Sequence, residues 1–324
     1  MKIAILTGGP SAERGIALNS AKLVENHLDT NKYSHRLIIV EDDGWYDQTS
    51  GNKLDLNDFS LTIDDIRTTF DFAFLMIHGT PVEDGKLQGY FEMQGIPHST
   101  CSTLTCALTF NKQWCKDFLE KYDVPMAKSE VINSDAIQNV DPNKFNYPVF
   151  VKPNKNGSSY GVSRADTAGD LPASLAQAAQ YDTEIMVEEY MAGREFSCGA
   201  VKDGEVIHVF PITEIIPEGE FFDYDAKYLG AGQEVTPADL DPTLADQCHH
   251  ETERLYRILD CQGMVRFDYI LVGDLFKLLE VNTVPGMSEA SIIPQQAKAY
   301  GWTIAHMLDV VIEDAMNQNK ITPT

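Results

Sequence analysis

The chain has 324 residues, more than one ordinary hydrophobic core supports, so two or three domains are expected. Hydrophobic residues make up 43% of it and aromatic residues 10%, which excludes a disordered chain. The formal net charge is −24, from 49 acidic and 25 basic residues. Such a surface repels phosphate backbones and anionic lipids, so we expect no nucleic-acid and no membrane partner.

The six cysteines are scattered among apolar neighbours and include no C-x-x-C pair. The opening MKIAILTGG has only a four-residue apolar run, far short of a signal sequence or a membrane span. We therefore expect reduced, mostly buried thiols and a cytoplasmic protein.

The first elements predict an α/β unit with a parallel sheet. Ile3–Leu6 is a short apolar strand, a glycine turn follows it, and Ala12–Leu28 has the apolar period of a helix. The turn does not spell G-x-G-x-x-G, so a dinucleotide fingerprint is not supported. Glu13 follows the strand at its carboxyl end, where open α/β sheets bind ligands.

A second strand, Phe72–Ile77, ends in a similar turn that begins with His78. A single histidine at a strand end is more often structural than catalytic, but two such turns in one unit favour a ligand role for His78. Asp64-Asp65 is expected to open a short helix before this strand. Leu104–Tyr122 is expected to form one helix that contains Lys112.

The middle of the chain offers donors for phosphate. An apolar strand ends in Lys152-Pro153 and runs into a Gly/Ser loop over 154–162, which supplies a cation and backbone N–H groups. A Walker loop is absent, and a Gly/Ser loop alone is most often a hairpin tip. Glu188 follows on another apolar strand and could accept from an exocyclic amine, or could be solvated strand-end charge. The aromatic segment 221–228 could cover a base.

Met264–Ser291 contains the residues that suit a metal ion best. Glu280 and Asn282 are two apart, so on a strand both face the same side. Together with Asp268 they offer two carboxylates and an amide oxygen, with no His or Cys nearby, which suits Mg²⁺. The alternative is an ordinary hairpin with a polar face.

The hairpin turn decides whether Asp268 joins that side. A two-residue turn at Gly273-Asp274 would pair Asp268 with Leu279, whereas a three-residue loop that includes Leu275 would set it opposite Glu280. We predict the three-residue loop.

Taken together, these residues resemble the ATP-grasp superfamily and, within it, the D-alanine-D-alanine ligases, from Met1 to about Met316. The motifs that carry the resemblance lie in the order of that family. They are Gly8-Gly9-Pro10-Ser11-Ala12-Glu13-Arg14, His78-Gly79 with Glu83-Asp84-Gly85, Leu87-Gln88-Gly89, Val151-Lys152-Pro153, Gly157-Ser158-Ser159-x-Gly161, Asp223-Tyr224-Asp225-Ala226-Lys227-Tyr228, Arg266-x-Asp268 and Glu280-x-Asn282-x-x-Pro285-Gly286-Met287.

The resemblance implies an ATP-grasp fold behind a Rossmann-like N-terminal domain, with residues 1–100, 101–190 and 191–324 as the three domains. It implies ATP-dependent joining of two D-alanines through an acylphosphate, for peptidoglycan precursors, by a cytoplasmic homodimer. A segment over residues 220–230 would close over the site as a lid.

The resemblance also implies a role for each matching residue. For ATP, these are Lys112, Lys152 and Lys227 at the phosphates, Glu188 and Glu195 at the adenine amine and ribose, and Phe221 at the adenine face. For metal, they are Asp268, Glu280 and Asn282, holding two Mg²⁺ or Mn²⁺ ions. For the amino acids, they are Glu13 at the first ammonium, His78 nearby, Arg266 and the Gly286 N–H at the tetrahedral intermediate, Ser291 at the second carboxylate, and Ser158 and Tyr228 between substrate and lid.

Two departures lie near the first-substrate site. Val82 stands where that family usually has glycine, and Gly15-Ile16-Ala17 replaces a more polar segment. One alternative is therefore another ATP-grasp carboxylate-amine ligase that joins a different pair, including D-alanine with D-lactate or D-serine. A regulatory nucleotide-binding module is an alternative of another class. The intact set around Asp268 and Arg266 argues against the module, because a binder needs no oxyanion donors.

Overall fold

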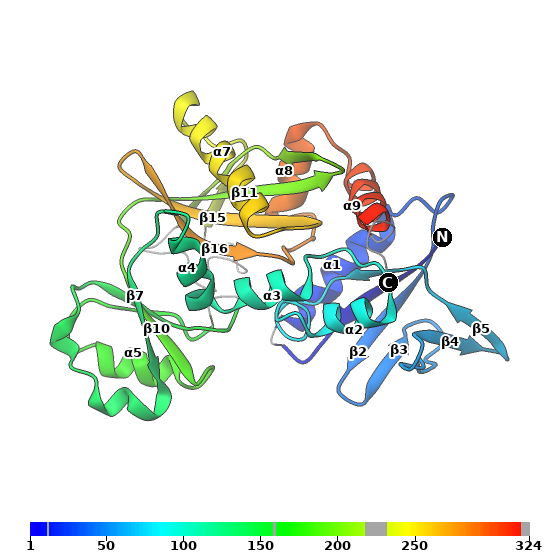
Figure 1. Cartoon of the computed structure of the whole chain (residues 1–324), viewed down its shortest axis with the longest axis horizontal. Coiled ribbons are helices and arrows are strands. Elements are labelled where there is room, and N and C mark those ends of the chain that lie inside the picture. The colour runs from blue at the N-terminus through cyan, green and yellow to red at the C-terminus, as the bar shows by residue number, and fades with distance from the viewer. Residues whose placement is uncertain (12, 158–159, 218–231, 319–324) are drawn as a thin grey trace.

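The structure, a computed structural model, describes residues 1–11, 13–157, 160–217 and 232–318. The described part is an α/β fold with three larger sheets and one two-stranded hairpin (Figure 1). The predicted α/β class is confirmed. No described helix is both long and apolar enough to span a lipid bilayer.

The N-terminal sheet is the parallel unit that the sequence predicts. Its strands in spatial order are β3 (Gly44–Asp47), β2 (Ser34–Glu41), β1 (Lys2–Gly8) and β6 (Phe72–Leu75). β1 runs parallel to β2 and β6 and is buried from Ile3 onward, as expected for a strand covered on both faces. Helices α1 (Arg14–His27) and α2 (Lys86–Gln94) follow the two strand-end turns.

The predicted helix at Asp64-Asp65 is wrong. These two residues are the turn between β4 (Ser60–Ile63) and β5 (Ile66–Thr69), with φ of 48° and 63°. Aspartate tolerates the left-handed conformation that a two-residue hairpin turn requires. A pair of aspartates therefore turned the chain here and did not cap a helix.

The predicted single helix over Leu104–Tyr122 is two helices, α3 (Thr103–Phe110) and α4 (Lys112–Glu120). Asn111 separates them, and its Oδ1 accepts from the Trp114 N–H at 3.0 Å as the N-cap of α4. Asn154 donates to the same Oδ1 at 2.9 Å from the next part of the chain. The break thus places Lys112 at the start of a new helix.

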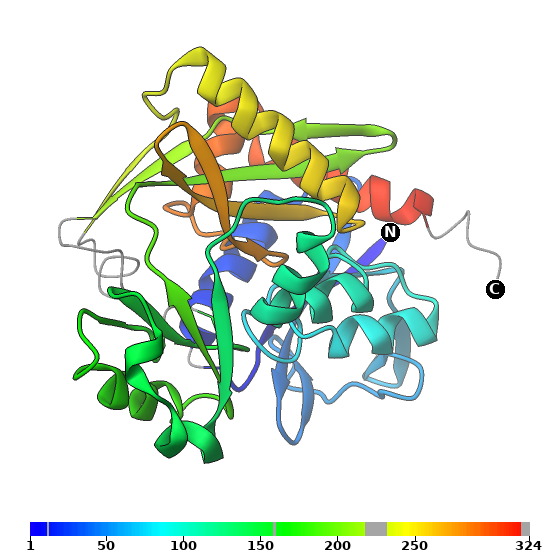
Figure 2. The same ribbon diagram turned by 60° about the vertical axis from the view of Figure 1, so that its left-hand side comes forward.

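The central sheet is antiparallel and has few helices of its own. In spatial order its strands are β7 (Ser129–Asn133), β10 (Glu184–Glu189), β8 (Val149–Pro153) and β9 (Ser163–Ala165). Its helical segments are α5 (Leu171–Ala178) and the 3₁₀ turns η1 (Ser134–Asn139) and η2 (Pro142–Lys144). Figure 2 shows this part as a lobe beside the rest of the molecule.

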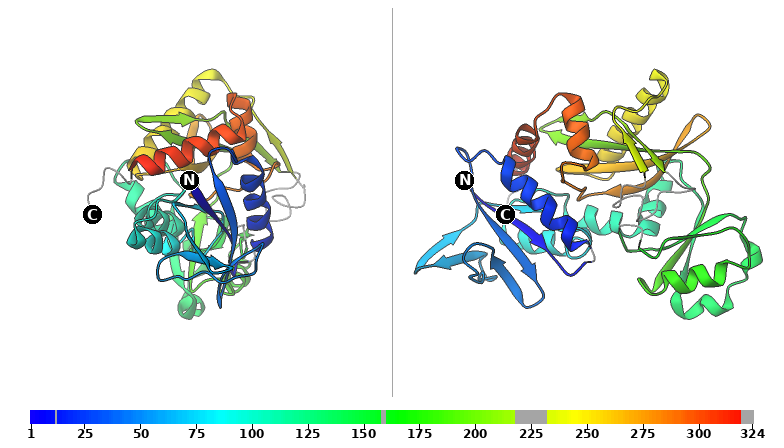
Figure 3. Two further views of the ribbon diagram at one scale, coloured as in Figure 1. Left: turned by 90° about the vertical axis from the view of Figure 1, so that its right-hand side faces the viewer. Right: turned by 180° about the vertical axis from the view of Figure 1, so that it is seen from behind.

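The C-terminal sheet forms the other side of the molecule. Its path is β14 (Gly232–Val235), β13 (Thr213–Pro217), β11 (Arg194–Asp203), β15 (Met264–Val272) and β16 (Leu275–Asn282), with β12 (Val206–Val209) paired to β11. Its helices are α7 (Pro242–Ile258), α8 (Ile292–Tyr300) and α9 (Ile304–Gln318). Helix α1 of the N-terminal part packs against α9 (Figure 3).

The β15–β16 register confirms the predicted pairing but not the predicted loop. Val272 pairs with Leu275, so the turn has two residues, Gly273 and Asp274. A register shift next to Asp268 leaves Leu279 unpaired and sets Asp268 opposite Glu280. The extra residue therefore sits in a β-bulge within the strand and not in the loop.

Candidate active site

A cavity of about 420 Å³, here called the main cavity, lies where the N-terminal part, α3–α4 and the C-terminal sheet meet. Sequence-predicted site residues from all three parts line it. They are Glu13, His78, Lys112, Glu195, Arg266, Asp268, Glu280, Asn282, Gly286 and Ser291.

Four hydrogen bonds hold the Asp268 carboxylate in the main cavity. Arg266 donates to its two oxygens at 2.9 and 2.8 Å, and Asn282 Nδ2 donates at 2.8 Å. The Ser197 hydroxyl also donates to it. Asp268 is only 3% exposed, so these partners replace water around its charge.

Glu280 faces the α3–α4 side of the main cavity. Its Oε2 lies 4.0 Å from Lys112 Nζ, which also donates to the Asn156 carbonyl at 2.6 Å. Lys112 therefore links the metal candidates to the loop that follows β8.

The donor set fits a hard divalent ion. Asp268, Glu280 and Asn282 present carboxylate and amide groups to one cavity, and no cysteine or histidine lies among them. Within the described ranges, no three His, Cys, Asp or Glu side chains form a metal-binding group by themselves. Arg266 and Asn282 occupy the Asp268 oxygens, so these partners would have to share them with an ion.

Glu13 lies between the two strand-end turns and the β8 loop. Ser11 accepts from the Glu13 N–H at 3.2 Å and donates to the His78 carbonyl at 2.7 Å, so the two turns are tied together. A methyl group added at Gly157 would come within 2.9 Å of Glu13 Oε2. Gly157 thus permits the loop to approach the Glu13 carboxylate closely.

His78 connects the N-terminal part to the loop that contains Gly286. Its Nδ1 lies 3.1 Å from the Val284 carbonyl, which can only accept, so Nδ1 carries the proton. Its Nε2 then accepts from Ser20 Oγ at 3.2 Å, and Ser20 accepts from the Met287 N–H at 3.1 Å. Burial lowers the pKa of His78, in agreement with this neutral tautomer.

Glu83 also lines the main cavity, although the sequence analysis gave it no role. Burial, reinforced by the nearby Glu13 carboxylate, raises the pKa of Glu83 to about 8. At neutral pH this side chain is therefore largely protonated, and it can donate a hydrogen bond inside the cavity.

Gly286 and Ser291 form one end of the main cavity. A methyl group at Gly286 would lie 3.0 Å from Ser291 Oγ, so glycine allows this close approach. Ser291 Oγ accepts from the Ser288 N–H at 2.9 Å, and Ser291 stands at the N-terminus of α8. The N–H groups at this helix start favour an anionic ligand.

The nucleotide candidates Lys152 and Glu188 lie on neighbouring strands of the central sheet, with their side chains buried together beside α4. Lys152 Nζ donates to one Glu188 oxygen at 2.6 Å, and Lys116 Nζ from α4 donates to the other at 2.5 Å. Glu195, by contrast, lines the main cavity from β11. The sequence predicted Glu188 and Lys152 separately but not this pair or Lys116.

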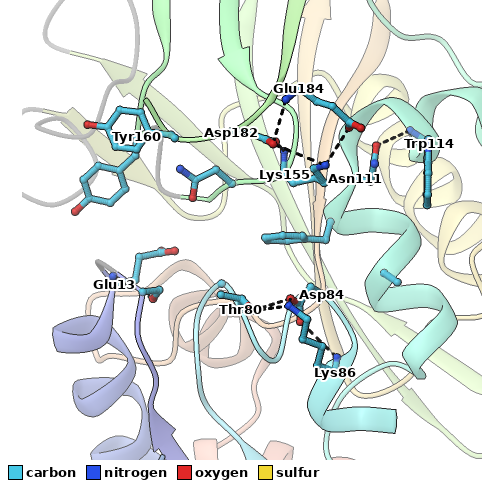
Figure 4. Close-up of a pocket in the computed structure, with 16 residues that line it drawn as sticks. Glu13, Thr80, Asp84, Lys86, Asn111, Trp114, Lys155, Tyr160, Asp182 and Glu184 are labelled. Carbon is cyan, nitrogen blue, oxygen red and sulfur yellow. Dashed lines mark hydrogen bonds and ion pairs between the residues drawn. The ribbon is translucent and has the colours of Figure 1, made fainter. Parts of the chain in front are cut away.

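A second space of about 710 Å³, here called the outer cavity, lies between the N-terminal and central parts. Figure 4 shows Glu13, Thr80, Asp84 and Lys86 on one wall, and Tyr160, Lys155, Asp182, Glu184, Asn111 and Trp114 on the other. Glu13 lines both cavities.

Several predicted residues lie outside the described part of the chain. These are Ser158, Phe221, Lys227 and Tyr228, together with the proposed lid over 220–230. Of the two departures, Val82 is fully buried in the core, whereas Ile16 lines the main cavity. Only the second departure therefore changes the cavity surface directly.

Two positions that the sequence analysis missed did leave a signal. Ser20 lies seven residues after Glu13, two helical turns along the same face of α1. Lys116 lies four residues after Lys112, on the same face of α4. Helical spacing from a predicted site residue would have found both.

Comparison with known proteins agrees with this geometry. A family model described as D-ala D-ala ligase N-terminus matches residues 2–101, and one described as D-ala D-ala ligase C-terminus matches residues 118–313. The chain belongs to the D-alanine-D-alanine ligase family. It is 40% identical to the D-alanine-D-alanine ligase of Phocaeicola vulgatus over 323 residues, covering 96% of this chain and 98% of that one. Against the enzyme of the same name from Parabacteroides distasonis, identity is 40% over 329 residues, with 98% of each covered.

Solved structures give the same fold. The D-alanyl-alanine synthetase A of Vibrio cholerae superposes with a TM-score of 0.88 at 26% identity, covering 98% of this chain and 99% of that one. VanG D-Ala:D-Ser ligase from Enterococcus faecalis gives 0.86 at 28% identity, with 97% and 99% covered. The Bacillus anthracis D-alanine-D-alanine ligase complexed with ATP gives 0.79 at 26% identity, with 99% of each covered. The predicted ATP-grasp fold is confirmed.

Proposed function

We propose that the chain is an ATP-dependent ligase that joins two D-alanines into D-alanyl-D-alanine for peptidoglycan precursors. The observation that carries the proposal is the main cavity, where Glu13, Arg266 and Gly286 meet the oxygen donors of the C-terminal sheet. ATP is also the ligand named for the Bacillus anthracis structure.

The reaction needs charge stabilisation and no protein nucleophile. The carboxylate of the first D-alanine attacks the γ-phosphorus of ATP, giving an acylphosphate and ADP. The amine of the second D-alanine, after losing a proton, attacks the acyl carbon, and phosphate leaves. Glu13 would hold the first ammonium, with neutral His78 beside it, and Arg266 and the Gly286 N–H would stabilise the oxyanion of the tetrahedral intermediate.

The second carboxylate would lie at Ser291 and the start of α8, where the helix N-terminus favours a negative charge. Ser158 and Tyr228 are proposed to connect the substrates to the segment over 220–230, which would keep water from the acylphosphate as a lid. Ile16 on the cavity wall would contact the first amino acid.

Two Mg²⁺ or Mn²⁺ ions would be held by Asp268, Glu280 and Asn282. When bound, they would neutralise charge on the phosphoryl oxygens of ATP. Lys112, Lys152 and Lys227 would hold phosphates, Glu188 and Glu195 the adenine amine and ribose, and Phe221 the adenine face. The oxygen-only donor set and Lys112, whose Nζ lies 4.0 Å from Glu280 Oε2, support this assignment.

We further propose the division into domains 1–100, 101–190 and 191–324, a homodimer and a cytoplasmic location. The three larger sheets and the residue ranges of the two family models support the division into domains. The homodimer and the location follow from the family resemblance. Gel filtration with light scattering tests the dimer, because a single species of one chain mass would contradict it.

A second candidate is a ligase that joins D-alanine to D-serine, because the Enterococcus faecalis structure is a D-Ala:D-Ser ligase with the same fold. Phosphate release from ATP, measured with each D- and L-amino acid and with D-lactate, separates the two. We expect release with D-alanine alone and D-alanyl-D-alanine as the product by mass spectrometry. A mixed product as the major species would favour the second candidate, and no release with any D-amino acid would contradict the ligase.

A further inference from the structure

Lys116, Glu188 and Lys152 form a buried cluster of one carboxylate between two ammonium groups. Each lysine takes its own oxygen of Glu188, at 2.5 and 2.6 Å. Relative side-chain exposure is 13% for Lys116, 5% for Glu188 and 9% for Lys152. The cluster therefore carries one excess positive charge where little water can screen it.

A gain in fold stability is a weak explanation for this cluster. A buried ion pair stabilises a protein weakly at best, because desolvating the charges offsets their attraction. Burial alone would raise the pKa of Glu188, but Lys152 and Lys116 outweigh it and hold that pKa below its ordinary value. Burial lowers the pKa of Lys116, an effect that Glu188 opposes. A second lysine on the one carboxylate, only 13% exposed and next to a proposed phosphate site, points to a ligand role.

The two lysines are attached differently. Lys152 lies on β8, diagonal to Glu188 across the β8–β10 pairing, so both belong to the central sheet. Lys116 comes from α4, which is bonded to that sheet at Asn154: the Lys112 N–H donates to the Asn154 carbonyl at 3.2 Å and the Gln113 N–H to its Oδ1 at 2.9 Å. The second cation is thus supplied by a separate element.

We propose that Lys116 is a positioning residue for the nucleotide, which keeps the Glu188 carboxylate charged and oriented while Lys152 is shared with a phosphate group. This inference rests on the proposed ATP site. Without Lys116, drawing Lys152 toward a phosphate would leave Glu188 buried without a cation, and nucleotide binding would weaken. Binding of the amino acids at Glu13, Arg266 and Ser291 would be unaffected, because no described contact joins Lys116 to these residues.

The test compares Lys116→Met with Lys116→Arg and with a matched control. Lys144 pairs with Glu130 at 2.5 Å in the same part of the chain, but that pair is exposed. We expect Lys116→Met to raise KM for ATP by about tenfold, the effect of losing one charged hydrogen bond, with KM for D-alanine changed less than about twofold. Lys116→Arg should stay within about threefold of wild type, and Lys144→Met should be unchanged.

An unchanged KM for ATP in a folded Lys116→Met variant would overturn the inference. So would equal increases in both KM values, or a failure of arginine to restore ATP binding, since these indicate a merely structural role. If the methionine variant does not fold, Lys116→Gln is measured in its place against the same criteria.

A double-mutant comparison separates this inference from the ATP site itself. Glu188→Gln should raise KM for ATP, and adding Lys116→Met should raise it little further, because the lysine acts through the carboxylate. If the two increases in KM for ATP multiply in full, Lys116 does not act through Glu188. That result would overturn the proposed role of Lys116 and leave the assignment of Glu188 unchanged. An unchanged KM for ATP in Glu188→Gln would contradict the assignment of Glu188 in the proposed function.

Discussion

The proposed active site has an amino-acid side, formed by the N-terminal sheet with α8–α9, and a nucleotide side, formed by the central sheet. These two sides differ in how they are packed. The N-terminal sheet and α8–α9 share one hydrophobic core, in which Ile5 and Val24 belong to the same cluster as Met287 and Met307. The central sheet has a small separate core. Its buried members are Ile132, Val149, Val151, Ala165, Leu171, Leu175, Ala178, Ile185 and Val187.

This difference in packing agrees with the different ligands proposed for the two regions. The shared core positions Glu13, His78 and Gly286 relative to one another, as their proposed roles in amide formation would require. Lys152 and Glu188 belong to the central sheet, which joins the rest through α4 and through a bridge between Met126 and Leu278. We therefore expect the nucleotide side to move and the amino-acid side to stay fixed.

The largest effect is expected at Glu280, which lies between the two sides near Lys112. Glu280→Gln should lower kcat by about a thousandfold or more, because the amide lacks the charge that is proposed to hold a divalent ion. Steady-state kinetics over a Mg²⁺ titration measures this, with the thermal midpoint as the control for folding. Activity near the wild-type level would remove Glu280 from the metal site.

The next effect concerns Glu83 and pH. Its pKa is raised from 4.5 to about 8 by burial and by Glu13, so its stabilising contribution is present below about pH 4.5 and lost as pH rises toward 8. Across this window the unfolding free energy of the wild type should fall by about 1.4 kcal/mol per pH unit relative to Glu83→Gln. Urea unfolding of both proteins measures the difference. Parallel pH profiles would show that Glu83 titrates normally.

A smaller effect is expected at Ser20, which connects His78 to the loop that contains Gly286 and Met287. Ser20→Ala removes the bonds to His78 and to the Met287 N–H, about 2 kcal/mol of positioning, so kcat should fall by tens of fold with KM for ATP unchanged. Ser99→Ala is the control, because Ser99 is a buried serine that accepts from the Leu75 N–H at 2.9 Å outside the main cavity. Equal losses of kcat in both variants would indicate general destabilisation.

The β15–β16 hairpin shows how far the sequence predicts the site. A regular hairpin with a two-residue turn would pair Asp268 with Leu279, so pairing Asp268 with Glu280 requires one extra residue in the loop or in the second strand. The sequence shows that this residue is needed but not where it lies. Strand packing places it at Leu279 as a bulge, although the loop was the simpler choice.

Long-range hydrogen-bond partners were harder to predict from the sequence than the strand register of β15 and β16. Ser20 bonds to the Met287 N–H, 267 residues away, and Lys116 to Glu188, 72 residues away. Spacing along a helix indicates which face these side chains share, but only the packed fold decides what lies opposite. The same holds for Asn111, whose capping oxygen also accepts a hydrogen bond from Asn154 of another segment.

Hydrogen exchange with and without nucleotide tests the division between the two sides most directly. Backbone amides of β8 and β10 should exchange faster than those of β1 and α9 in the protein alone. Adding Mg²⁺ and a non-hydrolysable ATP analogue should slow β8 and β10 strongly and change β1 and α9 little. Equal exchange in both regions, or equal protection of both by the analogue, would contradict a mobile nucleotide side and a fixed amino-acid side.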